Sequence, residues 1–251
     1  MAEPGEGAQH GRFVEDYRKL VDRLVGSNPI EEAMTLAIGG NDAFGDLELA
    51  ILDTYGLTED SYVIDVGCGS GRLTRRFAKM AKVRYLGTDV NERLIAFAQM
   101  TAKRSDFRYA LVDSTRIPEQ DNQADLVAFF SVGTHMMNEE FYLYLGEARR
   151  VLKPGGRIVF SFLDIQTPQG RSVMTQTAEV VGAGHRLEHL NVFMGRDDMP
   201  AWADFLAMEL VDVVPGDAPA FNATDGVAKV IGRTFFGLAF GQSVAVFEKP
   251  A

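Results

Sequence analysis

A short apolar run followed by three closely spaced glycines constrains the fold of this 251-residue chain more than any other feature. Residues 62–66 read Tyr-Val-Ile-Asp-Val, which is typical of a strand buried on both faces of a parallel sheet. Gly67, Gly69 and Gly71 follow directly, and glycine permits the tight, positive-φ turn that leads from such a strand into a helix. The pattern predicts a strand–turn–helix unit of an α/β protein.

Strands and helices alternate through the rest of the central region. Asn91 is a good N-cap for a helix that reaches about Ala102, and another helix is expected at residues 139–152. The further strands are expected at residues 83–88, 107–112, 125–131, 157–163, 210–214 and 243–247. Together these elements predict a doubly wound, seven-stranded, mostly parallel sheet with a Rossmann-like order.

The first third of the chain has the periodicity of helices. Phe13, Tyr17 and Leu20 recur every three or four residues and therefore share one helix face. Further helices are expected at residues 31–38 and 42–55. We interpret this region as a flexible leader and an N-terminal helical cap, followed by one domain that carries a helical insertion. The boundaries of these three parts are 1–57, 58–251 and about 165–207.

Composition excludes several classes of protein. Lys and Arg number 25 and Asp and Glu 35, so the net charge is −10, which disfavours a nucleic-acid partner. Cys68 is the only cysteine, so no internal disulfide forms, and the four histidines show no metal-ligand spacing. The sequence contains neither a signal peptide nor an apolar run long enough to span a membrane. We expect a cytoplasmic protein without a metal.

The spacing of the glycines distinguishes between two kinds of ligand. A glycine-rich turn before a helix aims backbone N–H groups at an anionic or polar ligand. Dinucleotide-binding turns need glycine or alanine at the sixth position, counted with the first glycine as position one. Arg72 occupies that position here. The observed pattern is Gly-x-Gly-x-Gly, with Asp65 two residues ahead of it.

At this point the sequence resembles the class I S-adenosylmethionine (SAM)-dependent methyltransferase family, in particular its small-molecule members of the ubiquinone/menaquinone-biosynthesis type. Five segments resemble the family motifs in order, and they cover about residues 60–165. These segments are residues 63–72, 85–89, 110–118, 124–127 and 148–156. The resemblance implies SAM as cofactor and S-adenosyl-L-homocysteine as product.

The resemblance also implies roles for individual residues in the glycine turn. Gly67, Gly69 and Gly71 would form the turn around the cofactor, with Cys68 as a small residue within it. Asp65 would lie close to the methionyl ammonium group and act through water or through the backbone.

Further residues would bind the nucleoside part. Asp89 would accept both ribose hydroxyls, because an acceptor-only carboxylate suits a vicinal diol. Val90 would pack on the adenine, Asp113 would bind its amino group, and Ser114 would contact the ring edge through the backbone. The alternatives are a solvated acid at 89, an ordinary core valine at 90 and a turn-forming Asp-Ser pair at 113 and 114.

The segment after the fourth expected strand lies at the mouth of the sheet, where open α/β folds bind ligands. Ser131 is expected beside the methionine part of the cofactor. His135 is the candidate general base, because an unperturbed histidine titrates near neutrality. A purely structural histidine is the alternative. His185 and His189 are further candidates in the looser segment that follows.

The methyl acceptor is not identified by the sequence. The fourth motif reads Ala-Asp-Leu-Val-Ala-Phe-Phe and lacks the Pro-Pro-Tyr type of stretch with which enzymes hold an amide or base nitrogen. We therefore expect a small-molecule O, N or C acceptor and a monomer or homodimer. The alternatives are a SAM-binding protein without transferase activity, a methyltransferase acting on protein side chains, and an NAD-dependent oxidoreductase.

Overall fold

The computed structural model describes residues 11–39 and 43–251. Its long helices and strands agree with the alternation expected from the sequence. The helices are α1 (Arg12–Ser27), α2 (Ile30–Leu36), α3 (Phe44–Thr54), α4 (Thr74–Phe77), α5 (Glu92–Ala102), α6 (Asn138–Val151), α7 (Pro168–Gly182), α8 (Met199–Phe205) and α9 (Asp225–Ile231). The strands are β1 (Tyr62–Val66), β2 (Arg84–Asp89), β3 (Arg108–Leu111), β4 (Ala124–Phe129), β5 (Leu152–Phe162), β6 (Glu209–Val214), β7 (Phe221–Ala223), β8 (Phe235–Leu238) and β9 (Ser243–Glu248).

Seven strands form one twisted sheet in the order β3-β2-β1-β4-β5-β9-β6. The first five strands of this order run parallel, whereas β9 is antiparallel to both of its neighbours. The order reverses between β1 and β4, so these strands flank the point where α/β sheets bind ligands. The prediction of a doubly wound, mostly parallel sheet of seven strands is confirmed.

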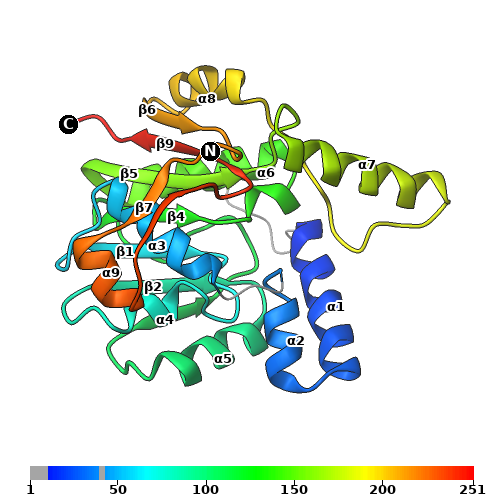
Figure 1. Ribbon diagram of the computed structural model, residues 1–251, viewed down its shortest axis with the longest axis horizontal. Coiled ribbons are helices and arrows are strands. Elements are labelled where there is room, and N and C mark those ends of the chain that lie inside the picture. Colours follow the sequence, from blue (N-terminus) through cyan, green and yellow to red (C-terminus); the bar gives the residue numbers. More distant parts are fainter. Residues whose placement is uncertain (1–10, 40–42) are drawn as a thin grey trace, which may run out of the picture.

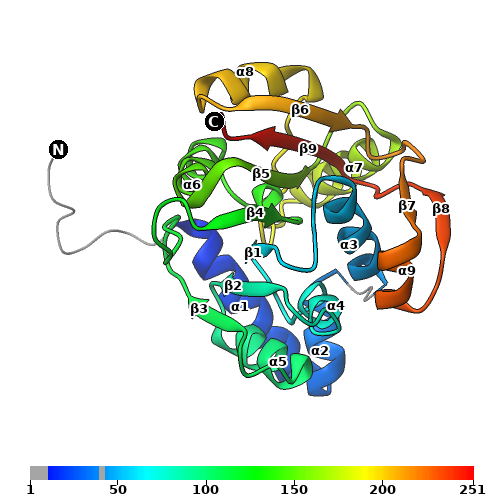
Figure 2. The same ribbon diagram turned by 90° about the vertical axis from the view of Figure 1, so that its left-hand side faces the viewer.

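Helices cover both faces of the sheet, as Figure 2 shows. On one face, Phe141 of α6 and Met199 of α8 share a buried cluster with Phe160 of β5. On the other face, Leu49 of α3 packs in a cluster with Val159, the neighbouring residue of β5. Because adjacent strand residues point to opposite faces, β5 contributes to both halves of the core.

Helices α1 and α2 lie beside the carboxyl ends of the parallel strands, and α7 projects outward on the same side (Figure 1). Val21 and Met34 of the two cap helices form a small buried cluster with Leu94 of α5. An ion pair of 2.7 Å between Arg23 and Glu188 connects α1 to the segment that follows α7. The cap helices therefore contact both α5 and the segment that follows α7.

The position of α3 bears on the division of the chain. Its residues Leu49 and Ile51 lie in the hydrophobic cluster under the sheet, apart from the cluster of α1 and α2. Residues 1–10 of the expected leader, and the expected helix start at Asp42, lie outside the described residues. The boundary near residue 57 and the insertion at about 165–207 stay predictions.

Two local features differ from the sequence expectation. Residues 153–156, which separate the expected helix at 139–152 from the expected strand at 157–163, lie within β5, because Gly155 and Gly156 exchange backbone hydrogen bonds with Lys249 beyond β9. A two-stranded sheet of β7 and β8, with α9 between them, was not expected at all. Its strands are too short for periodicity to identify them.

A substitution of Gly71 tests how the glycine turn after β1 packs against α5. Gly71 has φ of +88°, and an added Cβ would lie 2.9 Å from the Cβ of Ala98 in α5. We expect Gly71→Ala to lower the free energy of unfolding by about 1–3 kcal/mol through strain and overpacking. Urea denaturation followed by circular dichroism measures this change.

Gly146→Ala is the matched control. Gly146 lies within α6 and an added Cβ would meet no atom within 4 Å, so we expect a gain of up to ~1 kcal/mol. Equal stability losses in the two variants would contradict a specific requirement for glycine at position 71.

Candidate active site

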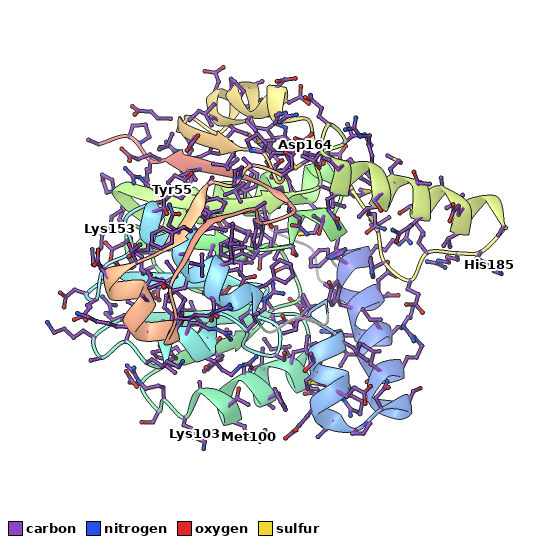
Figure 3. The ribbon with its side chains drawn as sticks, in the orientation of Figure 1. Tyr55, Met100, Lys103, Lys153, Asp164 and His185 are labelled. Carbon is purple, nitrogen blue, oxygen red and sulfur yellow. The ribbon has the colours of Figure 1, made fainter. Side chains whose placement is uncertain are left out.

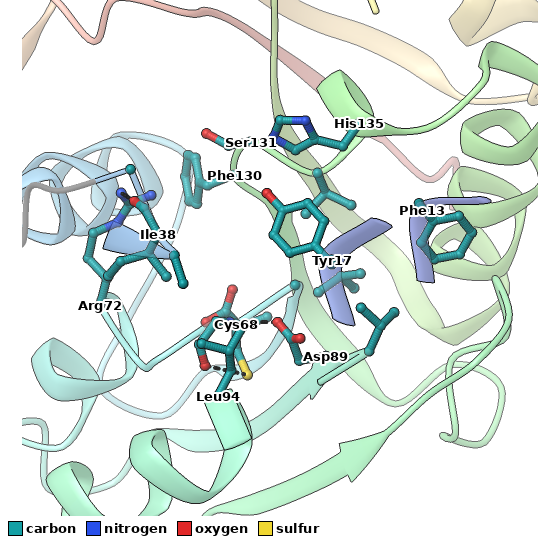
Figure 4. A pocket seen from close by; sticks show the side chains of 18 of the residues that line it. Phe13, Tyr17, Ile38, Cys68, Arg72, Asp89, Leu94, Phe130, Ser131 and His135 are labelled. Carbon is teal, nitrogen blue, oxygen red and sulfur yellow. Dashed lines mark hydrogen bonds between the residues drawn. The ribbon is translucent and has the colours of Figure 1, made fainter. Parts of the chain in front are cut away.

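A cavity of about 370 Å³ opens at the carboxyl ends of β1, β2 and β4, beneath the cap helices. This volume lies within the range of small-molecule sites. Side chains from distant parts of the sequence surround it, as Figure 4 shows. The residues that line it include Phe13, Tyr17, Ile38, Glu48, Asp65, Gly67, Cys68, Gly69, Arg72, Asp89, Val90, Val112, Phe130, Ser131, His135, Tyr144, His189 and Gln242.

The glycine turn forms the floor of this cavity. Gly67 and Gly69 have φ of +69° and +55°, the region that favours glycine. A Cβ at Gly67 would lie 2.5 Å from Val132 Cγ2, and one at Gly69 would lie 2.6 Å from Ile38 Cγ2. The absence of side chains therefore keeps this part of the cavity open. Gly71 is outside the lining and serves the packing of the turn instead.

Asp89 joins the two loops at the bottom of the cavity. Its Oδ2 accepts a hydrogen bond of 2.9 Å from the Gly69 amide, and its Oδ1 accepts one of 2.9 Å from the Asn91 amide. The side chain is only 6% exposed, and burial raises its pKa to about 6 despite these amide donors. A carboxylate has about four acceptor positions, and the Val90 backbone also contributes a hydrogen bond, so acceptor capacity remains for a ligand in the cavity.

Asp65 is the second buried acid of the site. It is 4% exposed and accepts a hydrogen bond of 2.8 Å from the Tyr85 hydroxyl. Burial raises its pKa to about 7, with the hydrogen bond from Tyr85 acting in the opposite direction. Burial and the nearby acids also raise the pKa of the Cys68 thiol, which keeps it protonated. Cys68 is therefore a small structural residue of the turn rather than a nucleophile.

Only some of the residues predicted to contact the nucleoside line the cavity. Val90 lines the cavity, and so does Val112, which the sequence did not single out. Asp113 and Ser114 are exposed and lie just beyond the lining at the end of β3. Their proposed contact with an adenine thus stays a prediction.

Ser131 lines the cavity in an unusual conformation. Its φ is +61°, which is strained for a residue other than glycine. The Ser131 amide donates to Ser161 Oγ at 2.8 Å, and Gln242 Nε2 donates to Ser131 Oγ at 3.1 Å. Ser161 Oγ in turn donates to Gln242 Oε1 at 2.7 Å. This network holds the end of β4 against β5 and the start of β9.

His135 lies across the cavity from Asp89, at the end of a short 3₁₀ turn (Figure 4). Its Nδ1 is 2.9 Å from the carbonyl oxygen of Leu190, and its ring centroid is 5.3 Å from that of Tyr17. Burial lowers the pKa of His135 to about 4, with a further contribution from His189. His189 also lines the cavity, whereas His185 is exposed near the end of α7, far from it (Figure 3).

Arg72 is a site residue whose contacts the sequence did not reveal. Its guanidinium donates to the Ile38 carbonyl at 2.9 Å and pairs with the buried Glu48 carboxylate. These contacts tie the end of α2 and the start of α3 to the glycine turn. Since both partners come from segments without a recognisable motif, only the fold brings them together.

Comparisons with known proteins agree with this geometry. A family model described as a methyltransferase domain matches residues 63–156. The 27-O-demethylrifamycin SV methyltransferase of Amycolatopsis mediterranei (strain S699) is 27% identical over 186 residues, covering 69% of this chain and 65% of that protein. The demethylmenaquinone methyltransferase of Tropheryma whipplei (strain Twist) is 31% identical over 150 residues and 60% of each chain.

A solved structure shares the fold. Phosphoethanolamine N-methyltransferase 1 of Haemonchus contortus, solved with phosphoethanolamine and S-adenosylhomocysteine, superimposes with a TM-score of 0.61. The match has 16% identity and covers 95% of this chain and 49% of that one.

The fold, the glycine turn and these matches define the class. Residues 63–156 are a methyltransferase domain, and the fold and the curated relatives support the class I SAM-dependent methyltransferase family. The chain spans less than two thirds of the length of the two curated relatives named above. The comparison with these relatives therefore covers only part of their length.

Within residues 11–39 and 43–251, no group of three or more His, Cys, Asp or Glu side chains could hold a metal ion. In the same part of the chain, no helix has the length and apolar character needed to cross a membrane.

The buried acids predict how stability depends on pH. An unfolded aspartate ionises near pH 3.9, whereas folded Asp65 and Asp89 ionise near pH 7 and 6. The folded state therefore binds more protons between about pH 4 and 7, so their contribution is fully present below that window and is lost as pH rises through it. At about 1.4 kcal/mol per pKa unit, we expect the free energy of unfolding to fall by up to about 7 kcal/mol from these two groups together.

Urea denaturation of the ligand-free protein at several pH values measures this fall. We expect Asp65→Asn to remove part of it, because an amide does not ionise. Glu59→Gln, which changes an exposed acid before β1, serves as the control and should leave the profile unchanged. A profile that is identical in all three proteins would contradict the assignment.

Proposed function

We propose that this protein transfers a methyl group from SAM to a small-molecule acceptor. The observation that carries the proposal is the Asp89 carboxylate, buried beside the Gly67–Gly71 turn in a cavity that also contains His135. The same cavity thus offers a nucleoside-binding acid and a basic group for an acceptor.

The residues present fit the cofactor. The missing side chains of Gly67 and Gly69 leave room for a ligand to approach the backbone, and the Asp89 carboxylate keeps acceptor capacity for the ribose hydroxyls. Val90 and Val112 supply apolar contacts for an adenine, with Asp113 and Ser114 at its outer edge. Asp65 and Ser131 would lie near the methionine part.

When bound, SAM supplies an electrophilic methyl group on a positively charged sulfur. The residues of this chain position the acceptor and exclude water, because transfer requires an in-line approach at about 3–3.5 Å. Tyr17 and Phe13 of the cap close the cavity against solvent. His135 is the candidate proton acceptor, since its lowered pKa keeps it neutral at pH 7.

The size and the walls of the cavity favour a small molecule over a protein side chain. Its walls come from the cap, the sheet and the segment after α7, and they leave about 370 Å³. The charge of −10 adds to the case against a nucleic-acid acceptor. The alternatives are a SAM-binding protein without transferase activity and a methyltransferase for protein side chains. A monomer or homodimer in the cytoplasm stays our prediction.

Isothermal titration with SAM, S-adenosylhomocysteine and NAD tests the cofactor site. We expect micromolar binding of the first two ligands and none of NAD, because Arg72 replaces the small residue of a dinucleotide turn. Asp89→Ala should weaken binding by more than about tenfold, or 1.4 kcal/mol, through loss of the diol acceptor.

Asp60→Ala is the control, since Asp60 is an exposed acid before β1, at the opposite end of the sheet. Circular dichroism of both variants checks their folding. Binding of NAD in place of SAM, or equal affinities in the two variants, would refute the proposed cofactor site.

A further inference from the structure

Two histidines share one backbone carbonyl at the edge of the cavity. His135 Nδ1 lies 2.9 Å, and His189 Nδ1 lies 3.1 Å, from the carbonyl oxygen of Leu190. The two rings meet edge to face with centroids 4.5 Å apart. They come from opposite sides of the site, because His135 follows β4 and His189 lies in the segment after α7.

The shared carbonyl fixes the tautomer of both rings. A carbonyl oxygen only accepts hydrogen bonds, so each Nδ1 must carry the proton that it donates. A neutral imidazole then has a bare Nε2, which is an acceptor. Both side chains line the cavity, and Figure 4 shows His135 there with Tyr17 and Ser131 around the same space.

The carbonyl itself is held in place on both sides. Glu188, two residues before Leu190, pairs with Arg23 of α1 at 2.7 Å. Val192, two residues after it, donates its amide to the Thr134 carbonyl at 2.8 Å. The segment that presents Leu190 is thus fastened to the cap and to the turn that carries His135.

We infer that His135 and His189 form one proton-accepting pair, and that the acceptor it serves is a hydroxyl group carried on an uncharged ring. This inference rests on the proposed methyl-transfer function and names the substrate class of the same site. His189 thereby becomes a further functional residue, contributed by a segment that carries no family motif.

The charges around the cavity favour an uncharged acceptor. Arg72 is the only Lys or Arg among the residues that line it in the described chain, and Glu48 and the Ile38 carbonyl already engage it. A phosphate or carboxylate would find no other cation there. The aromatic ring of Tyr17 lies 5.3 and 6.3 Å from the two imidazole centroids, which suits a flat ring better than a flexible chain.

The proton balance of the transfer assigns a task to each group. The acceptor oxygen forms a bond to the methyl carbon, the carbon–sulfur bond breaks, and its electron pair stays on sulfur. The hydroxyl proton passes to Nε2 of His135. The resulting imidazolium keeps its Nδ1 bond to the Leu190 carbonyl and lies within cation–π distance of Tyr17. His189 lies close enough to disfavour the charge on His135, so the proton is then released to solvent.

The groups that could disturb this titration are few. Tyr17 faces the pair from α1, and the remaining titratable or charged residues of the described lining are Glu48, Asp65, Cys68, Arg72, Asp89 and Tyr144. A proton on either histidine disfavours one on the other, which agrees with the lowered pKa of His135. At neutral pH His135 is therefore ready to accept a proton.

Nitrogen-15 NMR of the histidine side chains tests the pair without any turnover. In the S-adenosylhomocysteine complex we expect His135 and His189 to carry their protons on Nδ1, and His135 to stay neutral to about pH 5. Exposed His185, which lies outside the cavity lining, provides the internal control. A proton on Nε2 of either residue would overturn the pair.

Ligand binding tests the acceptor class in the same complex. We expect 2-naphthol to bind at least tenfold more tightly than 2-methoxynaphthalene, which lacks the hydroxyl proton, and more tightly than 2-naphthylamine. His135→Asn should abolish the preference, because asparagine replaces the Nδ1 donor but not Nε2. His189→Asn should weaken it, and His185→Asn should not change it.

The outcomes separate the two levels of the proposal. Absence of S-adenosylhomocysteine binding would refute the proposed function itself. Normal binding of that ligand, with no preference for the naphthol or with tighter binding of the amine, would refute only the hydroxyl acceptor.

Discussion

The Asp89 carboxylate holds together the loops on which the rest of the site depends. One of its oxygens accepts from the Gly69 amide and the other from the Asn91 amide, so the turn after β1 and the start of α5 share one buried acid. The Gly67 and Cys68 amides both donate to the Thr88 carbonyl just before it. A bond to a charged acceptor is worth about twice a neutral one, so these contacts fix the floor of the cavity firmly.

The cap completes the cavity through contacts to that floor. Arg18 of α1 donates to the Val90 carbonyl at 3.2 Å, and Ser70 of the turn donates to the Met34 carbonyl of α2 at 2.9 Å. Each contact joins a cap helix to a residue next to a motif glycine or next to Asp89. Opening the cap would therefore disturb the floor, so cofactor binding and cap closure should be coupled.

Local signals in the sequence predicted most of the fold, and most of the residues proposed for the site line the cavity. The strand at residues 62–66, the glycine turn and the Asn91 cap were read correctly, because each is encoded within a few neighbouring residues. Gln242 and Arg72 were not foreseen in their roles, since their partners lie far away in the chain. The periodicity around these two residues indicates secondary structure, and it carries no information about their distant hydrogen-bond partners.

The cavity divides into a charged half and an uncharged half. Asp65 and Asp89 lie on the turn side, whereas the opposite side presents aromatic rings and two imidazoles whose Nδ1 atoms face the Leu190 carbonyl. A positively charged sulfonium suits the first half, and its charge disappears during transfer. The second half gains a charge as its base accepts a proton. In the proposed transfer, positive charge thus moves from one half of the cavity to the other. The buried acids of the same cavity attract this charge and so reduce the free-energy cost of forming the imidazolium.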